Sequence, residues 1–252
     1  MLSKKIKELR DKISRNEPTI GSWIQLPSLN TTKLMIDAGY DWLCIDLEHG
    51  EIFENNLFSL ISLIQSNNIP CFVRVRSKTA HEFSKIAELG ASGVFIPNIS
   101  CSKDIDFAYD NLVWPPRGKR GIGFSTSNCF GQNFNKEYDN RIDPFIIPMI
   151  ENQDAITNLH SITKNSKADA FFIGPYDLSA SIGKTGRFED IEFKEILENI
   201  RDAIKKENKT LGIHIVEPSV EELEIKIKQG FNFIAYSIDT VFLNKSCQKP
   251  KI

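Results

Sequence analysis

The sequence of 252 residues predicts an α/β fold, a (β/α)8 TIM barrel, on two observations. Eight short apolar runs occur near residues 20–26, 42–46, 71–75, 93–97, 145–150, 170–174, 211–216 and 233–237. Most intervals between them have the apolar spacing of an amphipathic helix, as in Leu57-Leu60-Ile61-Ile64 and Ile196-Leu197-Ile200-Ile204. Buried strands alternating with helices are typical of a parallel barrel. We expect one domain over residues 1–252, with the barrel core at about 20–243.

An additional amphipathic helix is predicted before the first strand, over residues 2–14. Its apolar stripe recurs at spacings of four, three and four, in Leu2, Ile6, Leu9 and Ile13. One later segment, residues 111–142, interrupts the alternation of strands and helices with a Pro- and Gly-containing stretch followed by polar residues. A long irregular segment in a compact domain is usually functional or disordered.

Composition excludes several classes of partner. The net charge of -2 gives no reason to expect nucleic acid or an acidic membrane as a partner. No apolar run approaches the 18 residues of a transmembrane helix, so we expect no membrane span. Five cysteines without a Cys-x-x-Cys pair are typical of a reduced protein, and we expect a cytoplasmic location.

Charged residues gather where the second predicted strand ends. The apolar run 42–45 is followed within four residues by Asp46, Glu48 and His49, and Gly50 allows the chain to turn. Charge beside a buried strand costs free energy unless it is paired or bound. In α/β barrels the carboxyl ends of the strands also form the active site. A solvated loop is the alternative for one strand end alone, but charged ends recur along this chain.

The third strand ends in two arginines on one face, Arg74 and Arg76. If Val73 and Val75 pack beneath the outer helices, Arg74 lies in the barrel mouth and Arg76 one step further out. A guanidinium there is a fixed fork for a carboxylate. Structural pairing with a neighbouring acid remains an alternative.

Strands five and six each end in one carboxylate, Glu151 and Asp177. Because the strands are neighbours in a barrel, the two carboxylates are expected to converge. Two hard oxygen ligands suit Mg²⁺, Mn²⁺ or a similar divalent cation. Taken alone, Glu151 is more often a charge at a helix N-terminus than a ligand.

The other histidines are weaker candidates. His81 and His160 are in polar helical stretches and are expected at the surface. His214 lies within a strand, either as a core histidine or in the mouth. Asp239 either belongs to the site or caps the last helix, and the cap is the preferred interpretation.

Together these segments resemble the HpcH/HpaI aldolases, metal-dependent class II pyruvate aldolases of the phosphoenolpyruvate/pyruvate barrel superfamily. The resemblance runs from about Gly21 to Phe242 through Asp46-Leu47-Glu48-His49-Gly50, Val73-Arg74, the motif from Trp114 to Gly123, Ile150-Glu151 and Gly174-Pro175-Tyr176-Asp177-Leu178-Ser179.

The resemblance implies reversible cleavage of a 2-keto-4-hydroxy acid to pyruvate and an aldehyde. It implies that Glu151 and Asp177 bind the divalent cation (Mg²⁺, Mn²⁺ or Co²⁺) and that Arg74 holds the pyruvate oxygens. It also implies that His49 transfers protons with Asp46 orienting it. The segment Gly174, Pro175, Tyr176 and Asp177 would line the substrate site. Homo-oligomers, hexamers or trimers, are implied as well, often with a C-terminal helix exchanged between neighbours.

Elementary chemistry is consistent with these roles. A cation and a guanidinium stabilise the negative charge of an enolate, and an imidazole titrates near the working pH. The sequence departs from the family pattern around the rim, at Arg76, Glu88, Met149 and Tyr176, and in the segment 125–138. These departures bear on which aldehyde is bound more than on the binding of the pyruvate half of the substrate.

Two other interpretations compete with an aldolase. CoA-thioester lyases of the citryl- or malyl-CoA type belong to the same superfamily, but they resemble one another in an Asp-Leu-Glu-Asp sequence where this chain has His49. A catalytically silent binding barrel is the third interpretation. Retention of Glu151, Asp177, Arg74 and His49 together argues against it.

Overall fold

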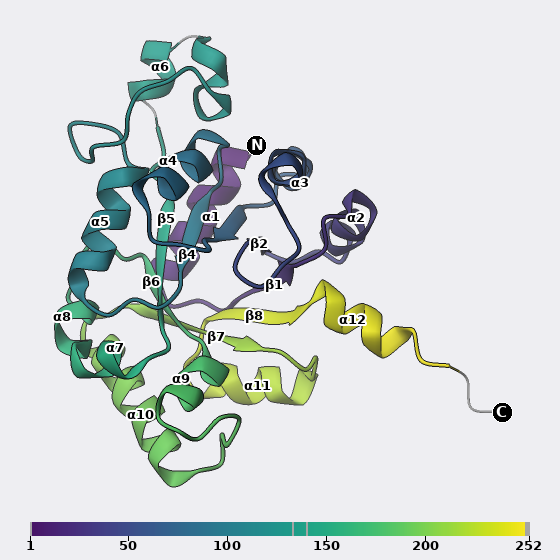
Figure 1. Ribbon diagram of the computed structural model, residues 1–252, viewed down its shortest axis with the longest axis vertical. Helices are drawn as coiled ribbons and strands as arrows, with labels where there is room; N and C mark the ends of the chain where they lie inside the picture. Colours follow the sequence, from purple (N-terminus) through teal and green to yellow (C-terminus); the bar gives the residue numbers. More distant parts are fainter. Residues whose placement is uncertain (1, 133, 140, 250–252) are drawn as a thin grey trace.

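The computed structural model describes residues 2–132, 134–139 and 141–249, and it confirms the predicted (β/α)8 barrel (Figure 1). All strand pairs are parallel, and the sheet closes because β1 pairs with both β2 and β8. The strands lie within two residues of the predicted runs: β1 (Thr19–Ile24), β2 (Trp42–Asp46), β3 (Cys71–Arg74), β4 (Gly93–Ile96), β5 (Phe145–Ile150), β6 (Ala170–Ile173), β7 (Thr210–Ile215) and β8 (Phe233–Ile238). The assignment of a single domain to residues 1–252 stays a prediction, and residues 1, 133, 140 and 250–252 lie outside the described residues.

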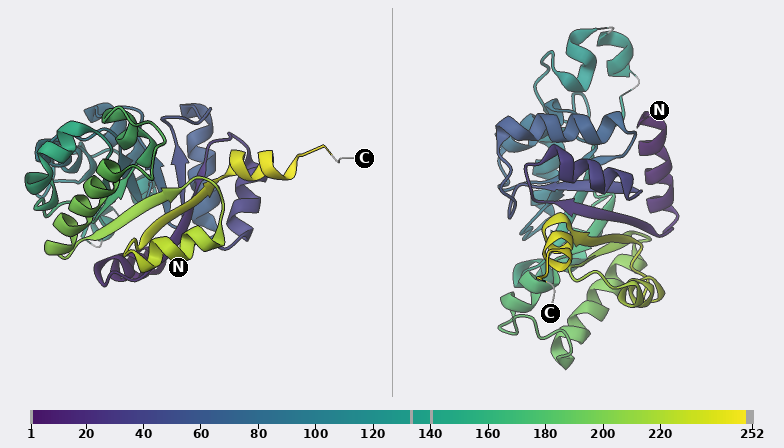
Figure 2. Two further views of the ribbon diagram at one scale, coloured as in Figure 1. Left: turned by 90° about the horizontal axis from the view of Figure 1, so that it is seen from below. Right: turned by 90° about the vertical axis from the view of Figure 1, so that its right-hand side faces the viewer.

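Helices cover the outside of the barrel (Figures 1 and 2). Several begin at the side-chain caps expected of such loops, since Ser28, Thr79, Asn152 and Ser219 each accept a backbone N–H of the helix that follows. In chain order they are α1 (Leu2–Ser14), α2 (Leu29–Asp37), α3 (Glu54–Ser66), α4 (Ala80–Glu88), α5 (Ser102–Leu112), α6 (Phe134–Asp139), α7 (Gln153–Thr157), α8 (Leu159–Thr163), α9 (Pro175–Ser181), α10 (Ile191–Lys206), α11 (Val220–Lys228) and α12 (Asp239–Ser246).

Aromatic side chains fill the barrel interior. Trp42 stacks on Phe233 with ring centroids 4.5 Å apart, and Phe95 lies 5.8 Å from the same ring. The outer faces of the strands carry aliphatic residues that pack beneath the helices. On β3 this alternation places Val73 in the outer layer and Phe72 in the interior, as the period of two predicts. Arg74, two residues after Phe72, therefore faces the interior at the mouth.

Helix α1 closes the amino end of the barrel, alongside the strand starts (Figure 2). Its buried residues Leu9 and Ile13 pack in the same interior cluster as Phe145, the first residue of β5. Arg10 bonds Asp169, just before β6, and donates to the carbonyl oxygen of Asp143 over 2.8 Å. The carboxyl ends of the strands are thus left to form the open mouth.

The segment 111–142, predicted to be irregular, has two short helical pieces after α5 among its described residues. They are the 3₁₀ turn η1 (Thr126–Gly131) and α6, which lie together at the top of Figure 1. Buried Asn128 organises the turn, because its side chain accepts the N–H of Ser125 and donates to the carbonyl of Gly123 over 2.7 Å. Local hydrogen bonds of this kind are invisible to an analysis of apolar periodicity.

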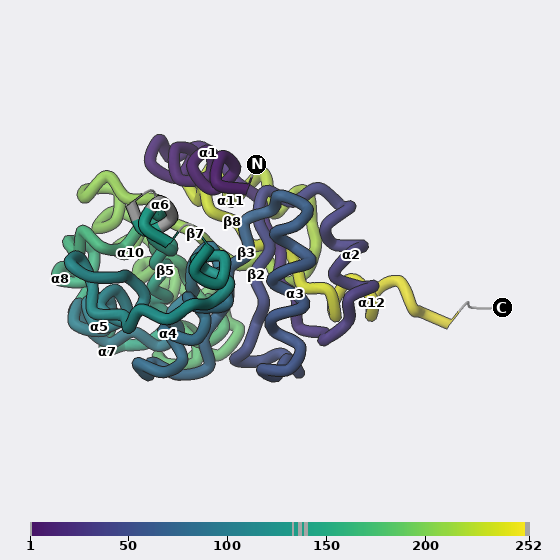
Figure 3. Tube along the Cα trace, turned by 90° about the horizontal axis from the view of Figure 1, so that it is seen from above, coloured from purple at the N-terminus to yellow at the C-terminus, as the bar shows by residue number. Residues whose placement is uncertain are grey.

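The last helix, α12, projects from the barrel, with its C-terminal end directed away from the other helices (Figure 3). It contacts β1, β8 and α2 near its start, while Leu243 remains 40% exposed. Within the described part of the chain, no helix combines the length and apolarity needed to cross a membrane.

Candidate active site

A cavity of about 220 Å³ opens at the carboxyl ends of the strands. Six of the predicted site residues line it, namely His49, Arg74, Gly174, Pro175, Tyr176 and Asp177. Two more, Asp46 and Glu151, are buried, with exposed fractions of 0% and 2%. Asp46 lies against Arg74, and Glu151 lies against Gly174, so the eight predicted residues form one site.

The base of the site is an ion pair between Asp46 and Arg74, the last residues of β2 and β3. The strand register places them side by side, and the guanidinium bonds both carboxylate oxygens, with Nε–Oδ1 at 2.8 Å and Nη2–Oδ2 at 2.6 Å. Burial alone would raise the pKa of Asp46, but the bonds and charge of Arg74 lower it below its usual value. Asp46 therefore remains an anion that fixes the orientation of Arg74.

Arg74 retains hydrogen-bonding capacity after this pairing. Its Nη1 lies 3.2 Å from Oε2 of Glu48, and its guanidinium carbon lies 4.5 Å from the centre of the Trp23 ring. A guanidinium has five N–H groups. Two bond Asp46 and one reaches Glu48, so two have no partner among the described residues.

His49 lies at the rim, with 56% of its side chain exposed. Its Nε2 is 3.9 Å from Oε2 of Glu48. Asp46 reaches His49 through the backbone, accepting its N–H over 3.3 Å and that of Glu48 over 3.1 Å. The turn needs glycine at residue 50, since a Cβ there would lie 2.2 Å from the carbonyl oxygen of Asp46. Asp46 thus holds the backbone that carries His49, and its predicted action on the imidazole itself stays a prediction.

Glu151 contributes a carboxylate with one unused oxygen. Oε1 accepts the N–H of Asn98 over 2.5 Å, whereas Oε2 is buried without a hydrogen-bond partner. Burial, with the charges of Asp177 and Glu48, raises the pKa of Glu151 to about 7. A Cβ at Gly174 would lie 2.4 Å from Oε2, so only glycine leaves room for this oxygen.

Asp177 is in the first turn of α9, two residues after Pro175, and it lines the cavity. Among the described residues, no group of three or more His, Cys, Asp and Glu side chains is gathered as a complete set of metal ligands. A site with two protein carboxylates suits Mg²⁺ or Mn²⁺, which retain water or substrate oxygens in their other positions. The unpartnered Oε2 of Glu151 is the atom that fits such a cation best.

Gln25 was not among the predicted site residues, but its Nε2 donates to Oδ2 of Asp46 over 2.9 Å. Its loop is held by Asp239, which accepts the N–H groups of Gln25 at 2.9 Å and Leu26 at 3.1 Å, and that of Thr240 in α12. Gln25 directly follows β1, so its place at a strand end was the available signal. An uncharged residue at such an end draws less attention than a carboxylate.

His214 combines the two placements left open for it. Its ring packs 5.5 Å from that of Trp23, and it also lines the cavity. Burial, together with the charge of Arg74, lowers the pKa of His214 to about 3, so the imidazole is neutral at physiological pH.

The remaining candidates lie away from the cavity. Arg76 pairs with Glu82, Nε to Oε1 at 3.4 Å, and 37% of its side chain is exposed. His81 and His160 are exposed, as expected.

Residues 19–246 match the model of the HpcH/HpaI aldolase/citrate lyase family. The chain belongs to this family. It is 27% identical to the 4-hydroxy-2-oxo-heptane-1,7-dioate aldolase of Salmonella dublin, over 95% of this chain and 91% of that protein. It is 26% identical to the hydroxypyruvate/pyruvate aldolase of Pseudomonas aeruginosa, over 97% and 91%. A crystal structure of a family protein from Burkholderia cenocepacia has the same fold, with a TM-score of 0.87, 24% identity and 95% coverage of both chains. The chain is therefore an enzyme of the aldolase or lyase class.

Proposed function

We propose that this enzyme is a divalent-metal-dependent class II aldolase that reversibly cleaves a 2-keto-4-hydroxy acid to pyruvate and an aldehyde. The observation that carries the proposal is the buried, unpartnered Oε2 of Glu151 beside Gly174, in a mouth that also holds the oriented guanidinium of Arg74. The relatives named above are aldolases of two different keto acids, so the name of neither is transferred to this chain.

In this proposal the two unpaired N–H groups of Arg74 bind the keto and carboxylate oxygens of pyruvate. Asp46 and the face of Trp23 hold the guanidinium in one plane, so little reorganisation is needed as charge develops on the enolate oxygen. Tyr176, which is 47% exposed, lies on the solvent side of the cavity, where the aldehyde half of the substrate would contact it.

Glu151 and Asp177 would hold the cation, Mg²⁺, Mn²⁺ or Co²⁺. When bound, the cation supplies Lewis-acid stabilisation of the enolate charge. A buried carboxylate with one free oxygen beside a second carboxylate is a costly arrangement without a positive charge, and that cost supports a cation there.

His49 is the group that we assign to proton transfer at the aldehyde oxygen. Its imidazole is at the rim, and imidazole is the side chain that titrates nearest neutral pH. Asp46 contributes by holding the backbone of the His49 turn and by orienting Arg74.

A pyruvate-dependent aldol screen tests the reaction class. Purified protein is incubated with pyruvate and a panel of hydroxyaldehydes and sugar aldehydes, with Mn²⁺, with Mg²⁺ and with a chelator. We expect carbon–carbon bond formation only when a divalent cation is present. Cleavage of a CoA thioester without aldol activity would favour the rival lyase instead.

The metal ligands are tested by metal analysis of Asp177→Ala. We expect loss of the bound cation, because one of its two protein ligands is gone. Asp154→Ala is the matched control, since Asp154 is in the first turn of α7 but outside the mouth. Wild-type metal content in Asp177→Ala contradicts the assignment.

Assembly and location are part of the proposal. We infer a homo-oligomer, a hexamer or a trimer, because α12 projects from its own barrel with Leu243 exposed, and α2 beside it exposes 68% of Leu34. Light scattering of the intact protein measures the state directly. All five cysteines lie in the described part of the chain and are free, which suits a cytoplasmic enzyme.

A further inference from the structure

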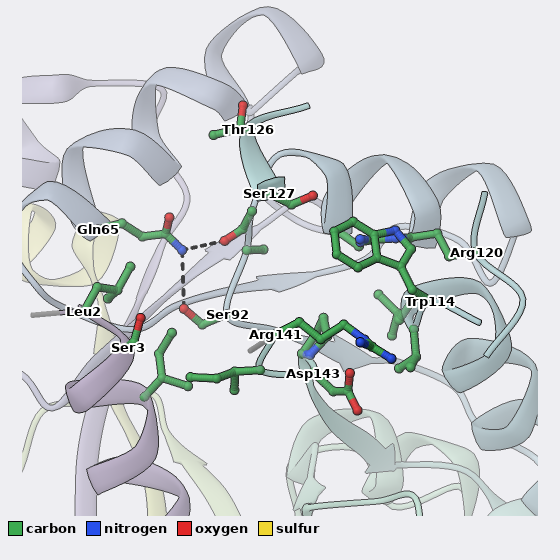
Figure 4. A pocket seen from close by; sticks show the side chains of 18 of the residues that line it. Leu2, Ser3, Gln65, Ser92, Trp114, Arg120, Thr126, Ser127, Arg141 and Asp143 are labelled. Carbon is green, nitrogen blue, oxygen red and sulfur yellow. Dashed lines mark hydrogen bonds between the residues drawn. The ribbon is translucent and has the colours of Figure 1, made fainter. Parts of the chain in front are cut away.

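A second cavity, of about 330 Å³, lies at the opposite end of the barrel from the mouth, near the starts of β4 and β5 (Figure 4). It is bounded by the start of α1, the end of α4 and the segment that contains η1. Its polar lining includes Ser92, Arg120 and Arg141. The proposed aldol reaction uses none of these residues.

Arg120 is the decisive group. The residue is only 5% exposed, and its Nε is buried without a hydrogen-bond partner. The guanidinium lies over the ring of Trp114, with its central carbon 4.3 Å from the ring centre (Figure 4). Burial lowers the pKa of Arg120 to about 10, and the charges of Glu88 and Asp143 only partly offset this. A buried guanidinium without a matching carboxylate is a costly group that an anion would stabilise.

Hydrogen bonds hold the loop of Arg120 and the side chain of Ser92 in the cavity lining. The backbone N–H of Arg120 bonds the carbonyl of Val113 over 3.1 Å, which fixes the loop. Gly118 permits that loop, because a Cβ there would lie 2.1 Å from the same carbonyl oxygen. Ser92 Oγ on the cavity wall is held between the N–H of Cys71 at 3.1 Å and the amide of Gln65 at 3.3 Å.

The acid of this cavity is already paired. Asp143 bonds Arg117 through both oxygens, at 2.7 and 3.0 Å. Arg141 donates to the carbonyl of Tyr138 and lies over its ring, but its Nε is also buried without a partner. The described lining residues therefore include two guanidiniums and one carboxylate, that of Asp143. Its charge is neutralised by Arg117, which does not line the cavity.

We propose that this cavity is a binding site for a small organic carboxylate, with its carboxylate on Arg120 and its carbon chain against the apolar wall. A guanidinium matches the two oxygens of a carboxylate in one plane. The lining also has apolar residues that would contact a short hydrocarbon chain, namely Leu2, Ile6, Ala87, Ala91, Val113 and Pro144.

Fluorine NMR of the intact protein labelled with 5-fluorotryptophan tests this site separately from the mouth. The chain has three tryptophans. Trp114 lies under Arg120, Trp23 lies under Arg74 in the mouth, and Trp42 is in the core. Each resonance is assigned with a Trp→Phe variant. Acetate, butyrate and inorganic phosphate are titrated at constant ionic strength.

We expect butyrate to shift the Trp114 resonance saturably, about tenfold more tightly than acetate, because two added methylene groups become buried. The shift should disappear in Arg120→Gln and persist in Lys119→Gln, which removes an exposed charge (78% of the side chain) one residue away. An unmoved Trp42 resonance shows that the variants are folded.

Three results overturn the proposal. They are a Trp114 resonance that no carboxylate moves saturably, a response to phosphate alone, and an undiminished response in Arg120→Gln. If Arg120→Gln does not fold, Arg120→Lys replaces it, because lysine retains the charge but lacks the planar fork. Wild-type affinity in Arg120→Lys contradicts the proposal, and weaker binding supports it.

Discussion

An arginine lies over a tryptophan near each end of the barrel, and the two pairs differ in what balances the charge. In the mouth, Arg74 is 4.5 Å from the Trp23 ring and bonds both oxygens of Asp46. At the opposite end, Arg120 is 4.3 Å from the Trp114 ring, and its Nε has no partner. A bonded carboxylate fixes the orientation of Arg74, whereas no carboxylate among the described residues bonds Arg120.

The largest expected effect is a loss of aldol turnover in a mouth variant that still binds pyruvate and metal. His49→Ala removes the group assigned to proton transfer, so aldol turnover should fall by about 10²–10⁴-fold. Pyruvate and metal affinity, measured by calorimetry on the same variant, should remain close to wild type, because Arg74 and the carboxylates are unchanged. His81→Ala, at an exposed position of α4, is the control. Unchanged turnover removes His49 from the mechanism, and lost pyruvate binding makes its role structural.

The next prediction tests whether Arg74 or Arg76, two residues apart at the end of β3, binds the substrate. Arg74→Ala should slow the reaction by about 10²–10³-fold, the usual effect of losing one donor to a developing oxyanion. Arg76→Ala should stay near wild type, since Arg76 lies outside the cavity and pairs with Glu82. Steady-state kinetics of both variants decide the matter, and the reverse ranking would falsify the placement of Arg74.

The free energy of unfolding should distinguish Arg74 from Arg120. Arg74→Gln leaves Asp46 buried without its charge partner, which typically costs about 3–5 kcal/mol. Arg120→Gln strands no bonded carboxylate and loses the contact with Trp114, which is worth about 0.5–2 kcal/mol. Denaturant unfolding of the two variants should show the larger loss in Arg74→Gln. Equal losses would mean that Arg120 is as firmly paired as Arg74.

The smallest expected effect is a pH dependence of stability that reports whether His214, in the mouth, is shielded from water. The pKa of His214 is about 3 in the folded protein, below its ordinary value of 6.5. As pH falls below 6.5, His214 is protonated in the unfolded chain but not in the folded protein, so the free energy of unfolding decreases. By pH 5 this contribution amounts to about 2 kcal/mol, and His214→Gln should lack it.

The measurement is the difference between wild type and His214→Gln across that pH range. The difference is needed because Glu151, whose pKa is raised to about 7, changes the stability in the opposite direction as pH falls. Protonation of Glu151 in the folded state adds stability as pH falls from 7 toward its ordinary range. Parallel pH curves for the two proteins would show that His214 is open to water.

The sequence by itself determined the architecture. Strands buried on both faces have continuous apolar runs, and helices with one buried face repeat every three to four residues. These periods are local, so the eight strands could be located within two residues. Charged residues within a few positions of the ends of apolar runs, such as Asp46, Glu151 and Asp177, could be expected at the mouth for the same reason.

Only the tertiary structure decided how these groups pair. The carboxylate of Asp46 bonds Arg74, 28 residues away, because the β2–β3 register places them side by side. Its contact with nearby His49 is through the backbone. The free oxygen of Glu151 depends on the lack of a side chain at Gly174, and Arg120 and Ser92 line one cavity although they lie in different loops. Local periodicity carries no information on strand register or loop packing, and these two features decide which side chains come together at each end of the barrel.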